Sequence, residues 1–295
     1  MREPPSFKQE LVSLFGQPVA ENPTQLMIES AFRHHGLDWR YLTIEVAPEH
    51  LGEAVRGMRA MGFRGGNCTI PHKVEVIRHL DRLGESASLM GAVNCIVRRG
   101  EELVGENTDG KGFLASLREV AEPRGAEVAI LGAGGAARAI AVELALAGAR
   151  RVTIVNRSRT RGEELVRLLC DEVEVAADFA PWTGDWRIPR SVHVLVQATS
   201  IGLFPDVDAR VPVDPSSLRS DLIVADVIPN PPATRLVRDA RARGCKVIDG
   251  LGMLVQQGVI GFEYWTGIRP DAAVMRGALE SVFGSSRPAD HLGRS

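Results

Sequence analysis

The chain is most informative at Val128-Ala129-Ile130-Leu131-Gly132-Ala133-Gly134-Gly135-Ala136-Ala137-Arg138-Ala139. An apolar run enters a glycine cluster here and an alanine-rich helical pattern leaves it, which predicts a strand, a tight turn and a helix. Glycines at such a turn let the backbone approach a dinucleotide pyrophosphate, and the helix N-terminus offers unpaired N–H groups. The spacing is G-x-G-x-x-A, and a second apolar strand follows at 151–155. The stretch therefore predicts a nucleotide site, with a ligand-free glycine turn as the alternative.

Apolar runs alternate with helical patterns on both sides of this stretch. Downstream, strands are expected near 127–131, 151–155, 192–197, 222–226 and 245–248, with helices between most of them. Strands alternating with helices predict a doubly wound parallel sheet with right-handed crossovers. Upstream, the patterns predict strands at 41–46, 65–70 and 92–97, a helix at 48–61 and another from about 111.

The predicted fold is therefore α/β with two domains. Residues 1–108 together with 250–295 form an N-terminal α/β substrate domain, and residues 109–249 form a Rossmann-type doubly wound dinucleotide-binding domain. Helices expected at 253–267 and 271–283 return to the first domain. That arrangement leaves a cleft between the domains, a common place for a substrate. The tail at 285–291 is expected to fray.

The bulk composition narrows the classes of partner. The 295 residues are 44% hydrophobic and 24% charged with a net charge of −2, which predicts a soluble globular protein. This charge gives no reason to expect nucleic acid or a membrane as partner. No run approaches the roughly 18 apolar residues of a membrane span, and the N-terminus lacks the apolar core of a signal peptide. The four cysteines are scattered without a C-x-x-C pair, so we expect reduced thiols, a cytoplasmic protein and no metal site.

Lys73 and Asp109 are the candidate groups for proton transfer. Lys73 follows a strand end and a proline turn, and Asp109 lies in a polar turn between the two predicted domains. A lysine acts as a general base when its surroundings tune its pKa, and a carboxylate orients the ammonium. A solvated lysine and a turn-forming aspartate are the simpler interpretations, because sequence spacing alone does not bring the two together. His72 is expected to be structural.

The second strand of the nucleotide unit ends in Asn156-Arg157-Ser158-Arg159-Thr160-Arg161. Sites for NAD usually place an acid here for the ribose 2′-hydroxyl, whereas an arginine suits the 2′-phosphate of NADP. No acid stands at this position, and Arg157 and Arg161 offer bidentate guanidinium donors. The pattern favours NADP, with a solvated basic helix start as the alternative.

Several short sequence blocks, taken in order along the chain, resemble the motifs of the shikimate dehydrogenase family. GGNCTIPHK at 65–73 resembles G-x-N-V-T-I-P-H-K, and GAVN at 91–94 resembles G-A-V-N. GENTDG at 105–110 resembles G-x-N-T-D-G, and DGLGMLVQQ at 249–257 resembles D-G-L-G-M-L-V-x-Q. The glycine turn and Asn156-Arg157-Ser158 resemble the family's NADP site.

The resemblance implies an activity and a set of site residues. The activity is reversible, NADP-dependent oxidation of a ring hydroxyl of shikimate or a closely related cyclitol carboxylate, in aromatic amino acid biosynthesis through the chorismate pathway. Lys73 and Asp109 are implied as the catalytic pair. The implied substrate ligands are Asn22, Thr24, Asn67, Thr69, Asn94 and Gln257. The implied cofactor site consists of Gly132, Ala133, Gly134, Gly135, Ala136, Asn156, Arg157, Ser158, Arg161, Thr199, Gly252 and Met253.

Two blocks depart from the family pattern. In the family's G-x-P-x-x-H-S-x-S-P-x-x-H-N, two serines hold the substrate carboxylate; here Asn22 and Thr24 stand at those positions and Glu21 adds negative charge. The family's D-x-x-Y-x-P becomes DVIPNP at 226–231, so Pro229 replaces a tyrosine. Chemistry residues are kept while recognition residues change, which suits a paralogue acting on quinate, an aminoshikimate or another cyclic polyol.

Two alternatives to this activity stay open. A non-catalytic NADP-binding regulator is disfavoured because a pure binder does not need Lys73 and Asp109. A folate-type dehydrogenase is disfavoured by the blocks that contain Asn94 and Gln257. The oligomeric state is expected to be a monomer or a homodimer.

Overall fold

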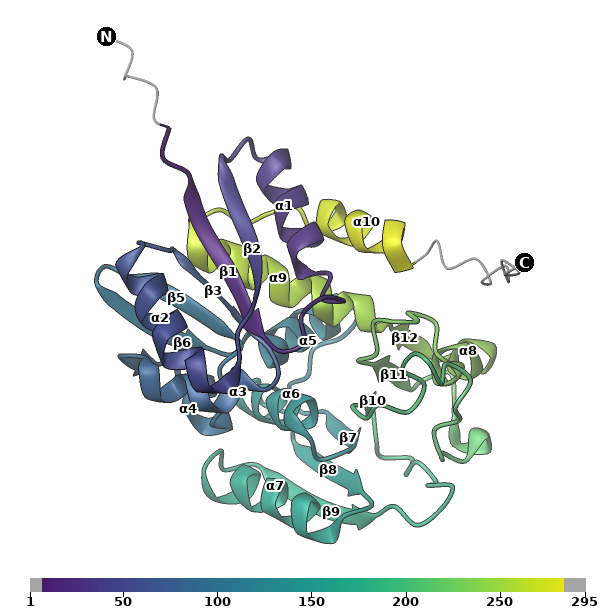
Figure 1. Ribbon diagram of the computed structural model, residues 1–295. Coiled ribbons are helices and arrows are strands. Elements are labelled where there is room, and N and C mark those ends of the chain that lie inside the picture. The colour runs from purple at the N-terminus through teal and green to yellow at the C-terminus, as the bar shows by residue number, and fades with distance from the viewer. Residues whose placement is uncertain (1–6, 284–295) are drawn as a thin grey trace, which may run out of the picture.

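The structure, a computed structural model, describes residues 7–283 and contains two six-stranded sheets joined through helices (Figure 1). Strands up to residue 106 form the first sheet, and strands between 127 and 248 form the second. This confirms the α/β class expected from the sequence. The tail for which fraying was expected lies outside the described residues.

The first sheet is mixed, with strand order β2-β1-β3-β5-β6-β4. Its strands are β1 (Glu10–Gly16), β2 (Trp39–Glu45), β3 (Gly65–Cys68), β4 (Arg82–Leu83), β5 (Cys95–Arg99) and β6 (Glu102–Glu106). β5 pairs antiparallel with both β3 and β6. β3 and β6 therefore run in the same direction, and their carboxyl ends lie at the same edge of the sheet as the amino end of β5.

The second sheet is parallel throughout, with strand order β12-β11-β10-β7-β8-β9. Its strands are β7 (Glu127–Leu131), β8 (Arg151–Asn156), β9 (Ala176–Pro181), β10 (Val194–Gln197), β11 (Ile223–Asp226) and β12 (Lys246–Ile248). The central strands are buried on both faces, which is why they read as continuous apolar runs. This confirms the expected doubly wound sheet, with the glycine turn at the carboxyl end of β7.

Helices cover both sheets. They are α1 (Thr24–His34), α2 (Leu51–Ala60), α3 (His72–Glu75), α4 (Glu85–Met90), α5 (Thr108–Arg118), α6 (Gly135–Leu146), α7 (Arg159–Asp171), α8 (Arg235–Ala242), α9 (Gly250–Thr266) and α10 (Ala272–Phe283). Within residues 7–283, three short 3₁₀ turns also occur: η1 (Pro48–His50), η2 (Val76–His79) and η3 (Pro215–Ser217).

α9 follows the last strand of the second sheet but packs on the first (Figure 1). Its residues Val255, Val259 and Phe262 share a buried cluster with Val12 and Leu14 of β1. α9 also packs along α5, the helix that links the two sheets. The C-terminal helices therefore return to the first sheet, as the sequence predicted.

The structure corrects several predicted elements. Strands β1, β4, β6 and β9 were not predicted; β9 is an alanine-containing edge strand that ends in a proline, a weak pattern for a strand. α5 begins at Thr108, three residues earlier than predicted, because the Asn107 side chain accepts hydrogen bonds from the backbone N–H groups of Asp109 and Gly110. Asp109 is thus in the first turn of a helix instead of a free turn.

Candidate active site

Lys73 and Asp109 meet at the edge of the first sheet where β3 and β6 end. Lys73 lies in α3, directly after β3, and Asp109 lies at the start of α5, directly after β6. Lys73 Nζ lies 2.6 Å from Asp109 Oδ2, and the two side chains are 34% and 22% exposed. The structure thus brings the predicted pair together, with enough exposure for a substrate to reach it.

Asn94 fixes the second oxygen of Asp109. Its Nδ2 donates to Asp109 Oδ1 at 2.8 Å, and its own Oδ1 accepts from the Thr108 backbone N–H at 2.6 Å. Asn94 precedes β5, whose amino end lies at the same edge. The carboxylate is therefore held at both oxygens, one by an ammonium and one by an amide that cannot rotate without losing the Thr108 contact.

A cavity of about 140 Å³ opens beside this pair. It is lined by Leu14, Asn22, Thr24, Asn67, Cys68, Thr69, Lys73, Asn94, Asp109, Leu254 and Gln257. All six predicted substrate ligands are among them. The cavity is smaller than the roughly 300–1,000 Å³ of pockets for drug-sized ligands, so it suits a compact molecule. We call it the substrate cavity.

The predicted ligands enter the substrate cavity from separate elements. Asn67 is in β3 and Gln257 is in α9, where its Oε1 accepts from Thr108 Oγ1 at 3.3 Å. Asn22 precedes α1, and its Oδ1 accepts from the Thr24 backbone N–H at 3.0 Å. That contact ties the Asn22 oxygen to the helix start and leaves its Nδ2 as a donor.

Sequence reasoning missed Leu14, Cys68 and Leu254 as cavity-lining residues. Cys68 lies inside the quoted 65–73 block at the position where the family pattern has valine, so the departure itself was the available signal. Burial raises the pKa of the Cys68 thiol to about 12, which keeps it protonated and unsuited as a nucleophile. His72 is 1% exposed and its Nε2 lies 2.8 Å from the Val46 carbonyl, which agrees with a structural role.

A second hollow, of about 630 Å³, lies over the glycine turn. Its lining includes Gly132, Ala133, Gly134, Gly135, Ala136, Asn156, Arg157, Ser158, Arg161 and Thr199, all of them predicted cofactor residues. Thr69 lines the substrate cavity and Ile70 lines this hollow, so the two spaces adjoin at the end of β3. Pro229 lines the hollow and not the substrate cavity.

The hollow fits a dinucleotide. Gly132 has φ +112°, and an added Cβ would lie 2.9 Å from the Ala198 carbonyl oxygen, so the turn requires glycine. Added Cβ atoms at Gly134 and Gly135 meet nothing within 4 Å, which leaves the start of α6 open to a ligand. Gly134 caps α6 without a side-chain hydrogen bond, so the first N–H groups of the helix are free for a pyrophosphate.

The arginines at the end of β8 line the same hollow. Arg157 and Arg161 both line it, and none of the described residues that do so is acidic. Ser158 accepts a hydrogen bond from the Arg161 backbone N–H and caps α7. This arrangement favours a 2′-phosphate. Gly252 and Met253 lie in the first turn of α9 and are not among the residues that line either space, so their cofactor role stays a prediction.

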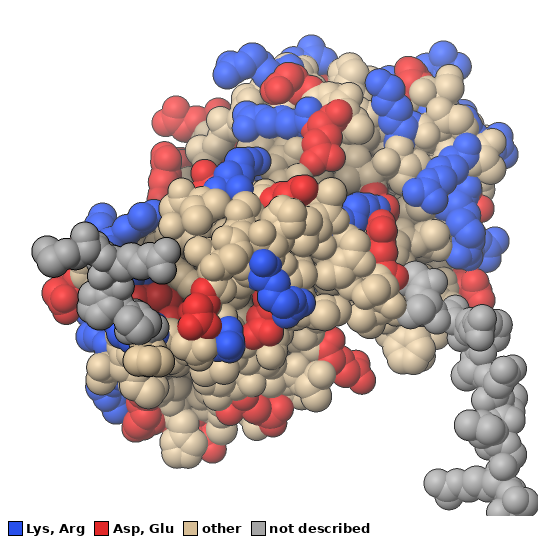
Figure 2. All heavy atoms as spheres, turned by 90° about the horizontal axis from the view of Figure 1, so that it is seen from above, with Lys and Arg blue, Asp and Glu red and all other residues tan. Residues whose placement is uncertain are grey.

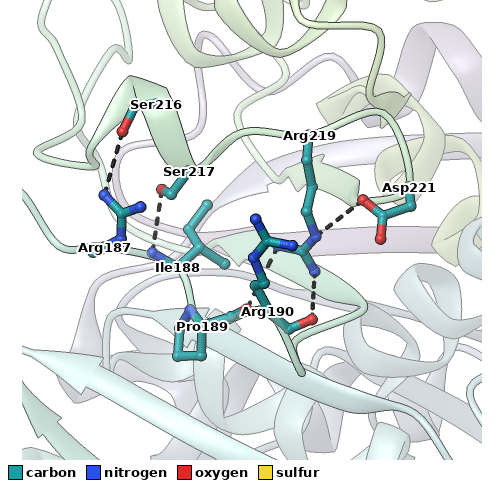
Figure 3. A pocket seen from close by; sticks show the side chains of 8 residues that line it. All are labelled: Arg187, Ile188, Pro189, Arg190, Ser216, Ser217, Arg219 and Asp221. Atoms are coloured by element: carbon teal, nitrogen blue, oxygen red, sulfur yellow. Dashed lines mark hydrogen bonds and ion pairs between the residues drawn. The ribbon is translucent and has the colours of Figure 1, made fainter.

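A further hollow of about 710 Å³ lies at the opposite, amino-terminal edge of the second sheet (Figure 3). Arg187 and Arg219 reach into it from the loops before β10 and β11. Arg219 pairs with Asp221 at 3.0 Å and donates to backbone carbonyls of the neighbouring loop. Arg187 pairs with Asp214 at 2.7 Å. These contacts hold the two loops together, away from the Lys73–Asp109 pair.

The described surface carries mixed charge. Figure 2 shows basic and acidic side chains interspersed with uncharged ones over one face. Within residues 7–283, no helix is long and apolar enough to cross a membrane. The same residues contain no group of three or more His, Cys, Asp or Glu side chains placed to hold a metal ion.

A Rossmann-type sheet with an open glycine turn, adjoining a cavity with a lysine–carboxylate pair, defines a dinucleotide-dependent oxidoreductase. Comparison with known proteins identifies the family of this oxidoreductase. Residues 14–96 match the shikimate dehydrogenase substrate binding domain, 115–181 match shikimate/quinate 5-dehydrogenase, and 250–280 match the shikimate 5′-dehydrogenase C-terminal domain.

Relatives that match over most of the chain include shikimate dehydrogenases and a 5-ketofructose reductase. The chain is 42% identical over 277 residues to the shikimate dehydrogenase (NADP(+)) of Desulforamulus reducens, covering 92% of this chain and 95% of that protein. The crystal structure of shikimate 5-dehydrogenase from Thermus thermophilus in complex with NADP(H) and shikimate has a TM-score of 0.79 at 33% identity, covering 92% of this chain and 99% of that chain. The ligand-free 5-ketofructose reductase of Gluconobacter sp. strain CHM43 has a TM-score of 0.92 at 52% identity, covering 94% and 100%.

The chain belongs to the shikimate dehydrogenase family and is an NADP-dependent oxidoreductase. The sequence-based predictions of family, enzyme class and cofactor are confirmed.

Proposed function

We propose that this protein reversibly oxidises a ring hydroxyl of shikimate, or of a closely related ring polyol, with NADP. The observation that carries the proposal is the Lys73–Asp109 pair at 2.6 Å, in a compact cavity that adjoins the dinucleotide hollow. Relatives named shikimate dehydrogenase (NADP(+)) support shikimate as the first substrate to test. With that substrate the enzyme belongs to aromatic amino acid biosynthesis.

The proposed chemistry divides two tasks between protein and cofactor. NADP, held at the glycine turn with Arg157 and Arg161, would supply the hydride acceptor for the ring carbon. The protein handles the proton: as the C–H bond breaks and the carbonyl forms, Lys73 in its uncharged amine form takes the hydroxyl proton and becomes the ammonium that pairs with Asp109. In the reverse direction, the Lys73 ammonium returns a proton to the carbonyl oxygen.

Asp109 and Asn94 position the proton-transfer group. Asp109 holds the lysine through Oδ2, and Asn94 holds the other oxygen, so Nζ has a fixed place at the cavity wall. The remaining proposed ligands, Asn22, Thr24, Asn67, Thr69 and Gln257, supply uncharged donors and acceptors for ring hydroxyls. The glycine turn with Arg157 and Arg161 is the proposed NADP site.

A second candidate is the NADPH-dependent reduction of an uncharged keto sugar. Of the described residues that line the substrate cavity, Lys73 is the one cation, and Asp109 neutralises it. A substrate carboxylate would therefore have only the Asn22 amide and the Thr24 hydroxyl near the N-terminal block. The 52% identical relative is named for its action on 5-ketofructose, which has no carboxylate.

The experiment that tests the proposal is a turnover screen. Shikimate, quinate, an aminoshikimate and fructose are offered with NADP and with NAD, and 5-ketofructose is offered with NADPH, while absorbance at 340 nm is followed. Oxidation of shikimate as the best substrate supports the first candidate, and preferred reduction of 5-ketofructose supports the second. No turnover of any of them contradicts the proposal and favours a non-catalytic NADP-binding regulator.

A variant separates the two candidates further. Asn22→Ser with Thr24→Ser and Glu21→His restores the family's N-terminal block. If the present residues disfavour a carboxylate, this variant gains roughly ten- to a hundredfold in kcat/KM for shikimate, the effect of one hydrogen bond to a charged group. Unaltered shikimate turnover would mean that the substitutions are neutral.

We also propose a division into domains, a cellular location and a state of assembly. The proposed domains are residues 1–108 with 250–295, and residues 109–249. The proposed location is the cytoplasm, and the proposed assembly is a monomer or a homodimer. Limited proteolysis, cell fractionation and light scattering test them in turn.

A further inference from the structure

Tyr41 contacts the substrate cavity indirectly. It lies in β2, two strands away from β3, and its side chain is fully buried. Val12 of β1 stands between them, opposite Tyr41 on one side and Gly65 on the other. The Tyr41 hydroxyl donates to Asn67 Oδ1 at 2.7 Å. Tyr41 is not among the residues that line the substrate cavity, whereas Asn67 is.

The surroundings of Asn67 determine which way its amide faces. Its Nδ2 donates to the Asn94 backbone carbonyl at 3.0 Å. A flipped amide would place Oδ1 against that carbonyl, oxygen against oxygen, and its NH₂ against the Tyr41 hydroxyl. Asn67 is 6% exposed, so water is poorly placed to replace the Tyr41 donor. Because Nδ2 carries two hydrogens and only one is used by Asn94, the other is available to the cavity.

We infer that Tyr41 is a positioning residue that makes Asn67 present an N–H donor to the substrate. The inference rests on the proposed function, because it takes Asn67 as a substrate ligand. An Asn67 held in this way binds a substrate oxygen that accepts a hydrogen bond. Tyr41 thereby contributes to substrate selection without touching the substrate.

The protein holds the Tyr41 ring in place for this contact. Trp265 of α9 lies beside it, with ring centroids 6.2 Å apart, and the indole N–H donates to the Ile96 carbonyl at 3.0 Å. Gly65 has φ +145°, and an added Cβ would lie 2.8 Å from Trp265 Nε1 and 2.1 Å from the Ile96 oxygen. Burial raises the pKa of the Tyr41 phenol well above its ordinary value, so the hydroxyl keeps its proton and remains a donor.

The test is a double-mutant cycle. Tyr41→Phe removes the hydroxyl and keeps the ring, and Asn67→Ala removes the amide that the hydroxyl orients. Steady-state kinetics use the compound with the highest kcat/KM in the turnover screen. Tyr264→Phe is the matched control: Tyr264 is the other tyrosine of the chain, and its hydroxyl contacts Lys111 Nζ at 3.3 Å outside the substrate cavity. Thermal melts of every variant report stability separately. Asn67→Ser replaces Asn67→Ala in the cycle if the alanine variant does not fold.

The expected result is a change in the substrate KM without a change in kcat. Tyr41→Phe raises the substrate KM about five- to tenfold, the value of roughly one hydrogen bond, and leaves kcat and the KM for NADP nearly unchanged. In the Asn67→Ala background the same change has no further effect, because the two residues act as one unit. Tyr264→Phe leaves all three constants unchanged.

Other results overturn the inference in distinguishable ways. An unchanged substrate KM in Tyr41→Phe, with or without a lower melting temperature, shows that Tyr41 is only structural. Equal effects of Tyr41→Phe with and without Asn67 show that it does not act through that amide. An unchanged KM in Asn67→Ala removes Asn67 from the proposed substrate site, and the inference falls with it.

Discussion

Lys73 Nζ and Asp109 Oδ2 lie 2.6 Å apart although 36 positions separate the two residues in the chain. The sheet explains the proximity. β3 and β6 run in the same direction on either side of β5, so the segments that follow them emerge at one edge. Neither residue is in a strand; each is in the helix that begins where its strand ends. The proposed proton-transfer pair is thus a consequence of strand order.

Asp109→Asn tests the carboxylate half of this pair. The substitution keeps the shape of the side chain and loses its charge, so the lysine loses its ionic partner. We expect kcat to fall by about 10²-fold, within the range for a positioned acid–base group, with a small change in melting temperature. Asp38→Asn, at an exposed aspartate just before β2, serves as control. Full multiplicativity with Lys73→Ala would show that the two residues do not act as a unit.

Arg157→Ala tests the recognition of the 2′-phosphate. Arg157 lines the dinucleotide hollow without an acidic neighbour in its lining. Loss of a hydrogen bond to a charged group is expected to raise the Kd of NADP roughly ten- to a hundredfold while NAD binding stays nearly unchanged. Arg159→Ala is the matched control, since Arg159 is paired with Glu163 at 2.7 Å and lies outside this lining. Equal weakening for both cofactors would contradict the assignment.

Asp226 provides a test through pH. It lies at the end of β11, 2% exposed, and accepts hydrogen bonds from Thr234 Oγ1 and the Ile228 backbone N–H. Burial raises its pKa from 3.8 to about 6. The folded state therefore binds a proton more readily than the unfolded state, and the stability of the protein falls as pH rises from about 4 to above 6.

Asp226→Asn removes this penalty and retains an oxygen for the Ile228 N–H. At pH 7.5 we expect the variant to exceed the parent in the free energy of unfolding by an amount on the order of 3 kcal/mol, from 1.36 kcal/mol for each pKa unit. At pH 4 we expect the variant and the parent to have nearly the same free energy of unfolding. Chemical denaturation at the two pH values measures it, and a variant that is less stable at pH 7.5 would show that the ionised carboxylate stabilises the fold.

The second sheet and its glycine turn were predictable from the sequence because parallel strands are buried on both faces and read as apolar runs. β9 escaped prediction because an edge strand with alanines and a proline lacks that pattern. The start of α5 was misplaced because the Asn107 cap acts through its side chain and leaves no periodic signal.

The candidate site was predictable as a set of residues and not as an arrangement. Short motifs identified Lys73, Asp109 and their neighbours, but their mutual distance follows from strand pairing. The Tyr41–Asn67 contact joins β2 and β3, which lie on either side of β1. No short sequence motif contains both residues, so the sequence did not indicate the contact. Gly252 and Met253 came from the resemblance alone, and neither is among the residues that line the hollow.

The most direct test of the account is kcat of Lys73→Ala at saturating NADP and the best substrate of the screen. Lys111→Ala is the matched control, because Lys111 forms a similar half-buried pair with Glu106 at 2.7 Å outside the substrate cavity. The account predicts a fall of about 10²–10⁴-fold in kcat for Lys73→Ala, with the Kd of NADP unchanged and the control near the parent value. A Lys73→Ala variant that turns over at close to the parent rate would contradict the proposal that Lys73 moves the proton.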